Sequence, residues 1–135
     1  MKDQVTSIEQ SKRLIELGVP AEKASMVWHR MFRDKKTGYT EWALKIGPIQ
    51  KFPQLEVLQI IPAFTVADLL GMIKPIDIGP NTCDPCLEKR GNEGVWRFEF
   101  GQILGDEDFG YAFNHSLIDL LADRIEWIVS NGYKK

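Results

Sequence analysis

The chain has 135 residues, of which 44% are hydrophobic and 27% are charged. This composition is typical of one compact globular domain, and a chain of this length buries roughly two thirds of its unfolded surface. Disorder is therefore excluded as the main state, and neither a disulfide nor a metal ion is needed for folding. No apolar run approaches the roughly 20 residues that span a bilayer, and the first six residues are polar. We expect a cytoplasmic protein with no membrane partner.

The charge is divided unevenly along the chain. The chain contains seventeen basic and nineteen acidic residues, which gives a net charge of −2. Residues 1–51 hold ten basic and six acidic residues, whereas residues 52–135 hold seven and thirteen. A chain with a pI of about 5.7 does not bind nucleic acid by general phosphate neutralisation. Only a local basic patch is compatible with that function.

The first predicted element is an amphipathic helix with a capping signal. It begins at Thr6 or Ser7, and Glu9 or Gln10 follows three residues later to bond the first unpaired backbone donors. It ends at Gly18, the residue type that tolerates the left-handed conformation at a helix end. The pattern thus defines both ends of the helix.

Two further helices carry the same local signals. Thr65 and Ser116 are each followed by Asp three residues later, which predicts a cap at both positions. The helix after Thr65 is expected to stop at Pro75, and the helix after Ser116 at Gly132. Together with the first helix, this makes about three amphipathic helices.

Alternating apolar and polar residues predict strands between these helices. We expect one hairpin from Met26 to Ile46, a buried strand from Leu55 to Ile61, and a second hairpin from Val95 to Phe113. The intervening stretch, Pro75 to Gly94, is rich in turn residues and is predicted to be a loop. The prediction is a single α+β domain over residues 1–135, with a mostly antiparallel sheet built from two hairpins packed against the helices.

A resemblance accompanies three of these segments. They are residues 9–18 (EQSKRLIELG), residues 62–65 (PAFT) with the following Leu69-Leu70, and residues 125–133 (IEWIVSNGY). Together they resemble an uncharacterised family of small bacterial proteins found in prophage-like and mobile-element regions. The resemblance covers the first 30 residues, the middle helix and the C-terminal helix, and it does not cover residues 74–94. It implies a cytoplasmic accessory protein and assigns no functional residue.

The pair Cys83 and Cys86 is the most pointed chemical feature of the sequence. Two cysteines separated by two residues can share a metal ion or form a small redox disulfide. A zinc site needs two more ligands, and the remaining histidines, His29 and His115, lie in different predicted elements. The predicted loop also lacks the strand and helix of a thioredoxin-like site. An incidental reduced pair is favoured; zinc bound by Cys83 and Cys86 and thiol redox chemistry stay open, and no other cofactor is expected.

The N-terminal region offers a second hypothesis. A first helix, a short helix from Ala21 to about Ser25 and then a hairpin resemble a helix-turn-helix with a wing. The short helix is poor in the side chains that contact base edges, so a solvated tip is favoured over nucleic-acid binding. The candidate phosphate contacts in this alternative are Arg30, Arg33, Lys35 and Lys36.

No catalytic residue is predicted, because no Ser or Cys has a His or Asp partner implied by spacing. The remaining residues that could form a binding surface are aromatic, namely four Trp and seven Phe. A sheet covered by helices on one face leaves its other face open, and aromatic residues there form a patch that binds a partner. We therefore expect a non-enzymatic interaction protein that binds an unidentified protein or a second copy of itself.

Overall fold

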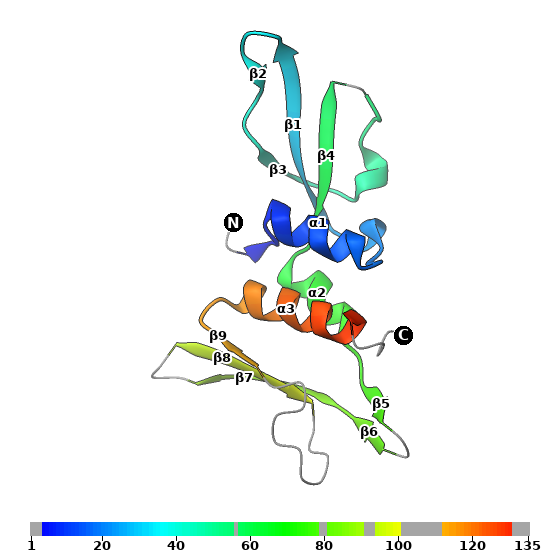
Figure 1. Cartoon of the computed structure of the whole chain (residues 1–135), viewed down its shortest axis with the longest axis vertical. Coiled ribbons are helices and arrows are strands. Elements are labelled where there is room, and N and C mark those ends of the chain that lie inside the picture. Colours follow the sequence, from blue (N-terminus) through cyan, green and yellow to red (C-terminus); the bar gives the residue numbers. More distant parts are fainter. Residues whose placement is uncertain (1–3, 56, 79–80, 91–93, 101–111, 131–135) are drawn as a thin grey trace. The chain divides into compact units, whose positions relative to one another are not determined.

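The computed structural model describes residues 4–55, 57–78, 81–90, 94–100 and 112–130 (Figure 1). The chain divides into two compact units, Met1–Asp68 and Leu69–Lys135. The α+β class is confirmed, because the described ranges contain three α-helices and strands that pair antiparallel. The strands form separate sheets of four, two and three strands, where one sheet was predicted.

Helix α1 (Ile8–Glu16) has the ends that its sequence predicts. The Ser7 hydroxyl accepts from the Gln10 backbone N–H, and the Gln10 side chain accepts from the Ser7 backbone N–H in return. At the other end Gly18 adopts a φ of 97°, which a residue with a Cβ adopts only with strain. The N–H groups of Gly18 and Val19 then close the helix on the carbonyls of Ile15 and Leu14.

The predicted second helix from Ala21 to about Ser25 is wrong. The structure has a single 3₁₀ turn, η2 (Ala21–Lys23), because the chain is already extended at Ala24. The next amide, that of Ser25, donates to the Asp68 carboxylate at 2.8 Å and not to a helix carbonyl. A helix long enough to enter a major groove is therefore missing between residues 21 and 25.

The sheet of the first unit is built around β1 (Met26–Asp34). On one side lie β2 (Gly38–Tyr39) and β3 (Ala43–Ile46), and on the other lies β4 (Leu58–Ala63). All three pair antiparallel with β1, so the hairpin predicted from Met26 to Ile46 is confirmed. Its returning strand is interrupted, since residues 40–42 separate β2 from β3.

The strand predicted from Leu55 to Ile61 differs in position and burial. It begins at Leu58, continues past Pro62 to Ala63, and is only half-buried over its first four residues. Pro62 is tolerated because β4 pairs with β1 on one side and, in the described part of the chain, with no strand on the other. A proline cannot donate to a ladder, which suits an edge strand.

A buried hydrogen-bond centre at Thr6 joins the start of the chain to this sheet. The Thr6 hydroxyl lies 2.7 Å from the Ser11 hydroxyl and accepts from the Phe64 backbone N–H at 3.0 Å. The Thr6 carbonyl accepts from the indole N–H of Trp28 at 2.9 Å. Thr6, Ser11 and Phe64 are fully buried, so the root of the sheet is held by satisfied polar groups within an apolar core.

Helix α2 (Val66–Met72) begins with the predicted cap. The Thr65 hydroxyl accepts from the Asp68 backbone N–H, and the Asp68 carboxylate accepts from the Thr65 backbone N–H. The same carboxylate accepts from both the backbone N–H and the hydroxyl of Ser25. Asp68 thus ties the turn before β1 to the start of α2.

The second unit contains strands where a loop was predicted from Pro75 to Gly94. The chain forms a hairpin and then a strand of the third sheet, so that prediction is wrong. The strands of this unit are β5 (Ile76–Ile78), β6 (Asn81–Cys83), β7 (Pro85–Arg90), β8 (Val95–Phe100) and β9 (Ala112–Asn114). The sequence conceals the first three because β5 and β6 have only three residues each, and because β7 pairs with a strand that lies beyond the segment, as Leu87 opposite Phe98 illustrates.

Helix α3 (Leu117–Ser130) packs on β8 and β9, as Figure 1 shows. Its start is the predicted one, because the Asp119 N–H donates to the Ser116 hydroxyl. The predicted hairpin from Val95 to Phe113 is confirmed as the β8–β9 pair. Phe98 and Phe100 are buried, and Trp127 of α3 stacks on Phe100. The predicted helix end at Gly132 lies outside the described residues.

Within the described ranges, no helix combines the length and apolar character required to cross a membrane.

Candidate functional site

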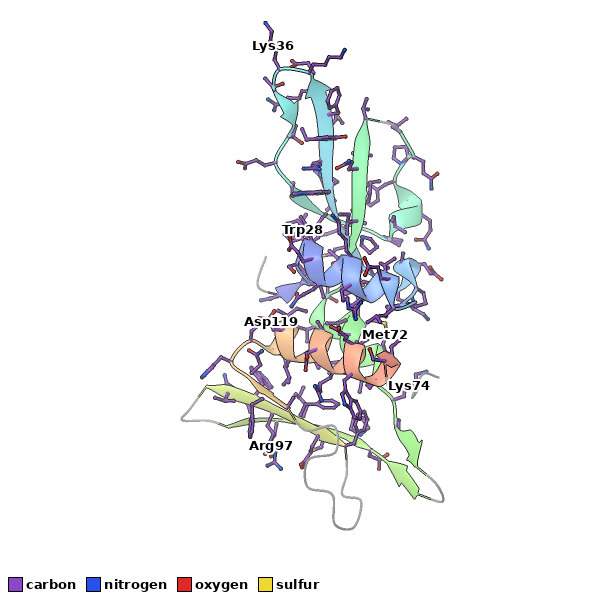
Figure 2. The ribbon with its side chains drawn as sticks, viewed as in Figure 1. Trp28, Lys36, Met72, Lys74, Arg97 and Asp119 are labelled. Atoms are coloured by element: carbon purple, nitrogen blue, oxygen red, sulfur yellow. The ribbon has the colours of Figure 1, made fainter. Side chains whose placement is uncertain are left out.

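The burial of β1 changes along its length. Met26 to Trp28 are buried, His29 and Arg30 are half-buried, and every residue from Met31 to Asp34 is exposed. Figure 1 shows the strand extending away from α1, and Figure 2 places Lys36 at the far end and Trp28 at the near end. We call residues 29–42, 52–55 and 57–60 the distal arm, and the buried start of β1, Met26–Trp28, the root.

Exposed apolar side chains gather on the distal arm. Of the eight large hydrophobic residues that are exposed in the described part of the chain, five belong to it. Their exposed fractions range from 37% for Phe32 to 52% for Leu55. The five residues are Met31, Phe32, Tyr39, Leu55 and Val57. Single exposed apolar residues are ordinary, so the feature that makes this arm a candidate site is that five of them lie on one projection.

The register divides these side chains between two faces. Directly opposed residues of an antiparallel pair share a face, so Phe32 lies with Tyr39 and Arg30 lies with Gln59. We call this side the aromatic face. Met31 lies with Leu58 and His29 lies with Ile60 on the opposite side, which we call the aliphatic face.

The aromatic face holds an ordered cluster around Arg30. Its guanidinium carbon lies 4.3 Å from the ring centre of Tyr39 and 4.5 Å from that of Trp42. Arg30 Nε donates to Gln59 Oε1 at 2.6 Å, and Gln59 Nε2 donates to the Tyr39 hydroxyl at 3.2 Å. Phe32 meets Tyr39 edge to face, with ring centres 5.3 Å apart. Five side chains from distant parts of the sequence thus fix one another.

The aliphatic face continues into a groove beside β4. The groove has a volume of about 370 Å³ and lies between β4 and the segment that begins at η3 (Ile49–Lys51). Seven residues line it: Ile49, Phe52, Pro53, Gln54, Leu55, Leu58 and Ile60. Gln54 is the single polar side chain among them. The groove has the size and character to take apolar side chains of a partner.

His29 adds a polar atom to the aliphatic face. Its Nε2 is buried, and within the described residues it has no hydrogen-bond partner. The neighbours of His29 across the sheet are Ala43 and Ile60, which supply no side-chain donor or acceptor. This is a buried polar atom that the fold leaves unsatisfied.

The tip of the distal arm is a tight polar turn. The Asp34 carboxylate accepts from the backbone N–H of Thr37, from the Thr37 hydroxyl and from the backbone N–H of Lys36. These bonds lower the pKa of Asp34, the backbone bond from Thr37 having the largest effect. The cations Arg33, Lys35 and Lys36 are all exposed around it.

The predicted phosphate contacts therefore separate into two groups. Arg30 lies in the aromatic cluster on the strand, whereas Arg33, Lys35 and Lys36 belong to the exposed end of the arm. Sequence reasoning selected Arg30 only for its charge and missed Tyr39, Trp42 and Gln59. The sequence did hold a signal for this face, because Trp28, Arg30 and Phe32 occupy every second position of β1 and therefore point to the same side.

The cysteine pair lies in strands and not in a loop. Cys83 ends β6 opposite Ile76, and Cys86 is the second residue of β7 opposite Glu99. Cys86 is a free, exposed thiol. Among the residues that the structure describes, no three or more His, Cys, Asp and Glu side chains are grouped so that they could hold a metal ion. The side chain of Cys83 lies outside the described residues, so zinc binding by Cys83 and Cys86 stays a prediction.

No protein-family model, curated protein or solved structure matches the chain.

Proposed function

We propose that this chain is a non-enzymatic protein-binding module and that the distal arm is its binding surface. The observation that carries the proposal is the loss of burial along β1, while apolar side chains continue to the exposed end. An uncovered sheet of this kind is stabilised when a partner removes its apolar surface from water. In line with the family resemblance, we propose a cytoplasmic accessory role in a phage or mobile element.

The third sheet provides an internal contrast that supports this proposal. On β8, Arg97 forms ion pairs with Glu88 at 2.9 Å and with Glu99 at 2.8 Å. Figure 2 shows Arg97 on the side of the sheet away from α3. This is the usual way to expose one face of a sheet to water. Among the described residues, that face also exposes one large apolar side chain, Phe113, which lies opposite Arg97, whereas the distal arm exposes five.

We propose a segment of another protein as the partner, with an apolar side chain in the groove beside β4. A groove of about 370 Å³ holds one or two side chains and not a whole domain. Because β4 has a strand on one side only in the described part, an extended segment can also pair with its outer edge. Both features suit a short linear segment.

The test is a selection from random peptides of about twelve residues, a length that suits groove and strand-edge recognition. The peptides are displayed on phage and selected on the immobilised full chain. Binding of each enriched peptide is then measured by calorimetry to the wild type, to Met31→Ser with Leu55→Ser, and to Ile46→Ser. Ile46 is the matched control, because it is 83% exposed and pairs with Met26 at the root.

We expect enriched peptides whose affinity falls about tenfold or more in the double variant and is unchanged in Ile46→Ser. Peptides that bind all three proteins equally, or a selection that enriches none, would overturn the proposal. Sedimentation velocity gives the remaining outcome. A wild-type dimer that the double variant converts to monomer would replace the foreign partner with a second copy of this chain.

A further inference from the structure

The Arg30 side chain is held in place before any partner arrives. Its Nε is bound to Gln59, and its guanidinium lies over the rings of Tyr39 and Trp42. Gln59 is itself fixed by its bond to the Tyr39 hydroxyl. A long side chain ordered in this way has already lost its rotamer freedom on folding. Binding to it therefore costs less entropy than binding to a mobile surface arginine.

The two terminal nitrogens of Arg30 are not used by this arrangement. Among the described residues, Arg30 forms no ion pair, and its one hydrogen bond is the bond from Nε to Gln59. A guanidinium presents parallel N–H groups that match the two oxygens of a carboxylate. Phe32, Tyr39 and Val57 supply exposed apolar surface nearby, since the Phe32 N–H donates to the Val57 carbonyl at 2.7 Å.

We infer that Arg30 is the anchor for an acidic side chain of the partner, flanked by apolar residues that pack on Phe32 and Val57. The inference rests on the proposed function and names the chemistry of the partner. When the segment covers the cluster it excludes water, which strengthens the guanidinium–carboxylate pair. The aromatic face then selects partner segments with Asp or Glu beside apolar residues.

The charge of the sheet supports an acidic partner. Residues 26–63 carry six basic residues against three acidic ones, although the whole chain is net negative. One of the three, Asp34, has its carboxylate engaged by the turn. The six basic residues are Arg30, Arg33, Lys35, Lys36, Lys45 and Lys51. Complementary charge of this kind speeds association and excludes basic partners.

A protein carboxylate fits these observations better than a nucleic-acid phosphate. Proteins that bind single strands stack bases on open aromatic rings, but Tyr39 and Trp42 each have Arg30 against the ring. Nucleic acid also has no use for the aliphatic groove on the other face, lined by Leu55, Leu58 and Ile60. Both faces of the arm are accounted for by a protein segment.

The test uses the enriched peptides on four full-length proteins: wild type, Arg30→Gln, Arg30→Lys and Arg33→Gln. Arg33→Gln is the matched control, since it removes one positive charge from the exposed part of the same strand. Arg30→Lys keeps the charge and removes the planar fork. Near-ultraviolet circular dichroism and thermal melting show whether each variant is folded. If a variant does not fold, the same contact is tested from the other side: the affinity of the wild type is measured for peptides in which Asp or Glu is changed to Asn or Gln.

We expect the enriched peptides to share Asp or Glu next to apolar residues. Their affinity should fall about tenfold or more with Arg30→Gln and with Arg30→Lys, and less than about twofold with Arg33→Gln. Peptides that need Met31 and Leu55 but bind normally to Arg30→Gln would overturn this inference and leave the proposed function standing. A selection without enriched peptides would overturn both.

A second readout covers nucleic acid. Fluorescence anisotropy is measured with a labelled oligothymidylate of about 20 nucleotides and a duplex of similar length at low salt, where phosphate contacts are strongest. We expect no binding that depends on Arg30. Salt-sensitive binding that Arg30→Gln abolishes would overturn the inference and make phosphate the ligand of this cluster.

Discussion

The root and the distal arm are two ends of the same strand with opposite surroundings. At the root, Trp28 is 7% exposed and its indole N–H is bonded to the Thr6 carbonyl. In the arm, Phe32 is 37% exposed and contacts Tyr39 at its edge. The two aromatic residues lie on the same face and are separated by one residue of that face, Arg30. The cover over the sheet therefore ends within the length of one strand.

This difference teaches that burial in a sheet can vary along the strands as well as across the two faces. An alternating sequence predicts which residues share a face only where the strand is continuous. Here the break at residues 40–42 brings Tyr39 and Trp42, which strict alternation would place on opposite faces, against the same Arg30 side chain. Alternation also does not predict how far the covering elements reach. The consequence is a testable division, in which changes at the root affect folding and changes in the arm affect binding.

The largest expected effect comes from truncating the two aromatic residues. Trp28→Ala should lower the free energy of unfolding by about 3–5 kcal/mol, because it leaves a cavity and an unpaired Thr6 carbonyl. Phe32→Ala should lower it by much less, about 1 kcal/mol, because Phe32 is 37% exposed and its removal leaves no enclosed cavity. Urea denaturation of both variants measures the difference. Equal losses would mean that the arm is part of the folding core.

Two threonines provide a second matched pair. The buried Thr6 hydroxyl accepts the Phe64 backbone N–H, and the hydroxyl of the half-buried Thr40 accepts the Met31 backbone N–H in a bond that solvent reaches. Thr6→Val should cost about 1–3 kcal/mol, since it leaves the Phe64 N–H buried without a partner. Thr40→Val should cost less than about 0.5 kcal/mol, because water replaces the lost bond. Chemical denaturation measures both losses. A larger loss for Thr40→Val than for Thr6→Val would contradict the difference in burial between the root and the arm.

Asp68 offers a smaller effect at the edge of the root. Its carboxylate accepts from Ser25 and from the Thr65 backbone N–H. Asp68→Ala removes these bonds and the α2 cap, and we expect a loss of about 1–2 kcal/mol. Asp68→Asn should recover part of that loss, because its amide oxygen can still accept. Thermal melting of the wild type and both variants measures these losses. Melting temperatures of the variants equal to that of the wild type would show that the carboxylate contacts contribute little.

The smallest effect is a pH dependence confined to the tip of the arm. Hydrogen bonds from Thr37 and Lys36 lower the pKa of Asp34 in the folded chain. The turn is therefore stabilised at pH values above the ordinary Asp pKa, and this stabilisation is lost as the pH falls through the lower folded value. NMR should show the Thr37 amide resonance shifting in that acid range while Trp28 is unaffected. The same titration on Asp34→Asn should be flat, and a shift that persists there would rule out this cause.

The local features of the fold are predictable from the sequence. The caps at Ser7, Thr65 and Ser116 are correct because each joins groups three residues apart. Of the strands between Pro75 and Gly94, β5 and β6 were missed because they have three residues each, and β7 was missed because it pairs with β8, outside that segment, as Cys86 opposite Glu99 shows. No local pattern marks a polar segment as the partner of a later strand.

The candidate site was only partly predictable for the same reason. Arg30 could be selected by its charge, but its cluster joins residues from three strands and an intervening segment, including Gln59. The sequence predicted that aromatic residues would lie on an uncovered part of a sheet, but it did not predict which part. Its position depends on where the helical cover of the sheet stops, which is a property of the packed unit.

The most direct measurement of the central claim is hydrogen exchange of the full chain with and without an enriched acidic peptide. We predict slower exchange at amides in residues 30–32 and 57–60, and no change at Met26–Trp28 or in β8. Protection confined to residues 85–100, or spread evenly over the chain, would contradict the assignment of the distal arm as the binding surface.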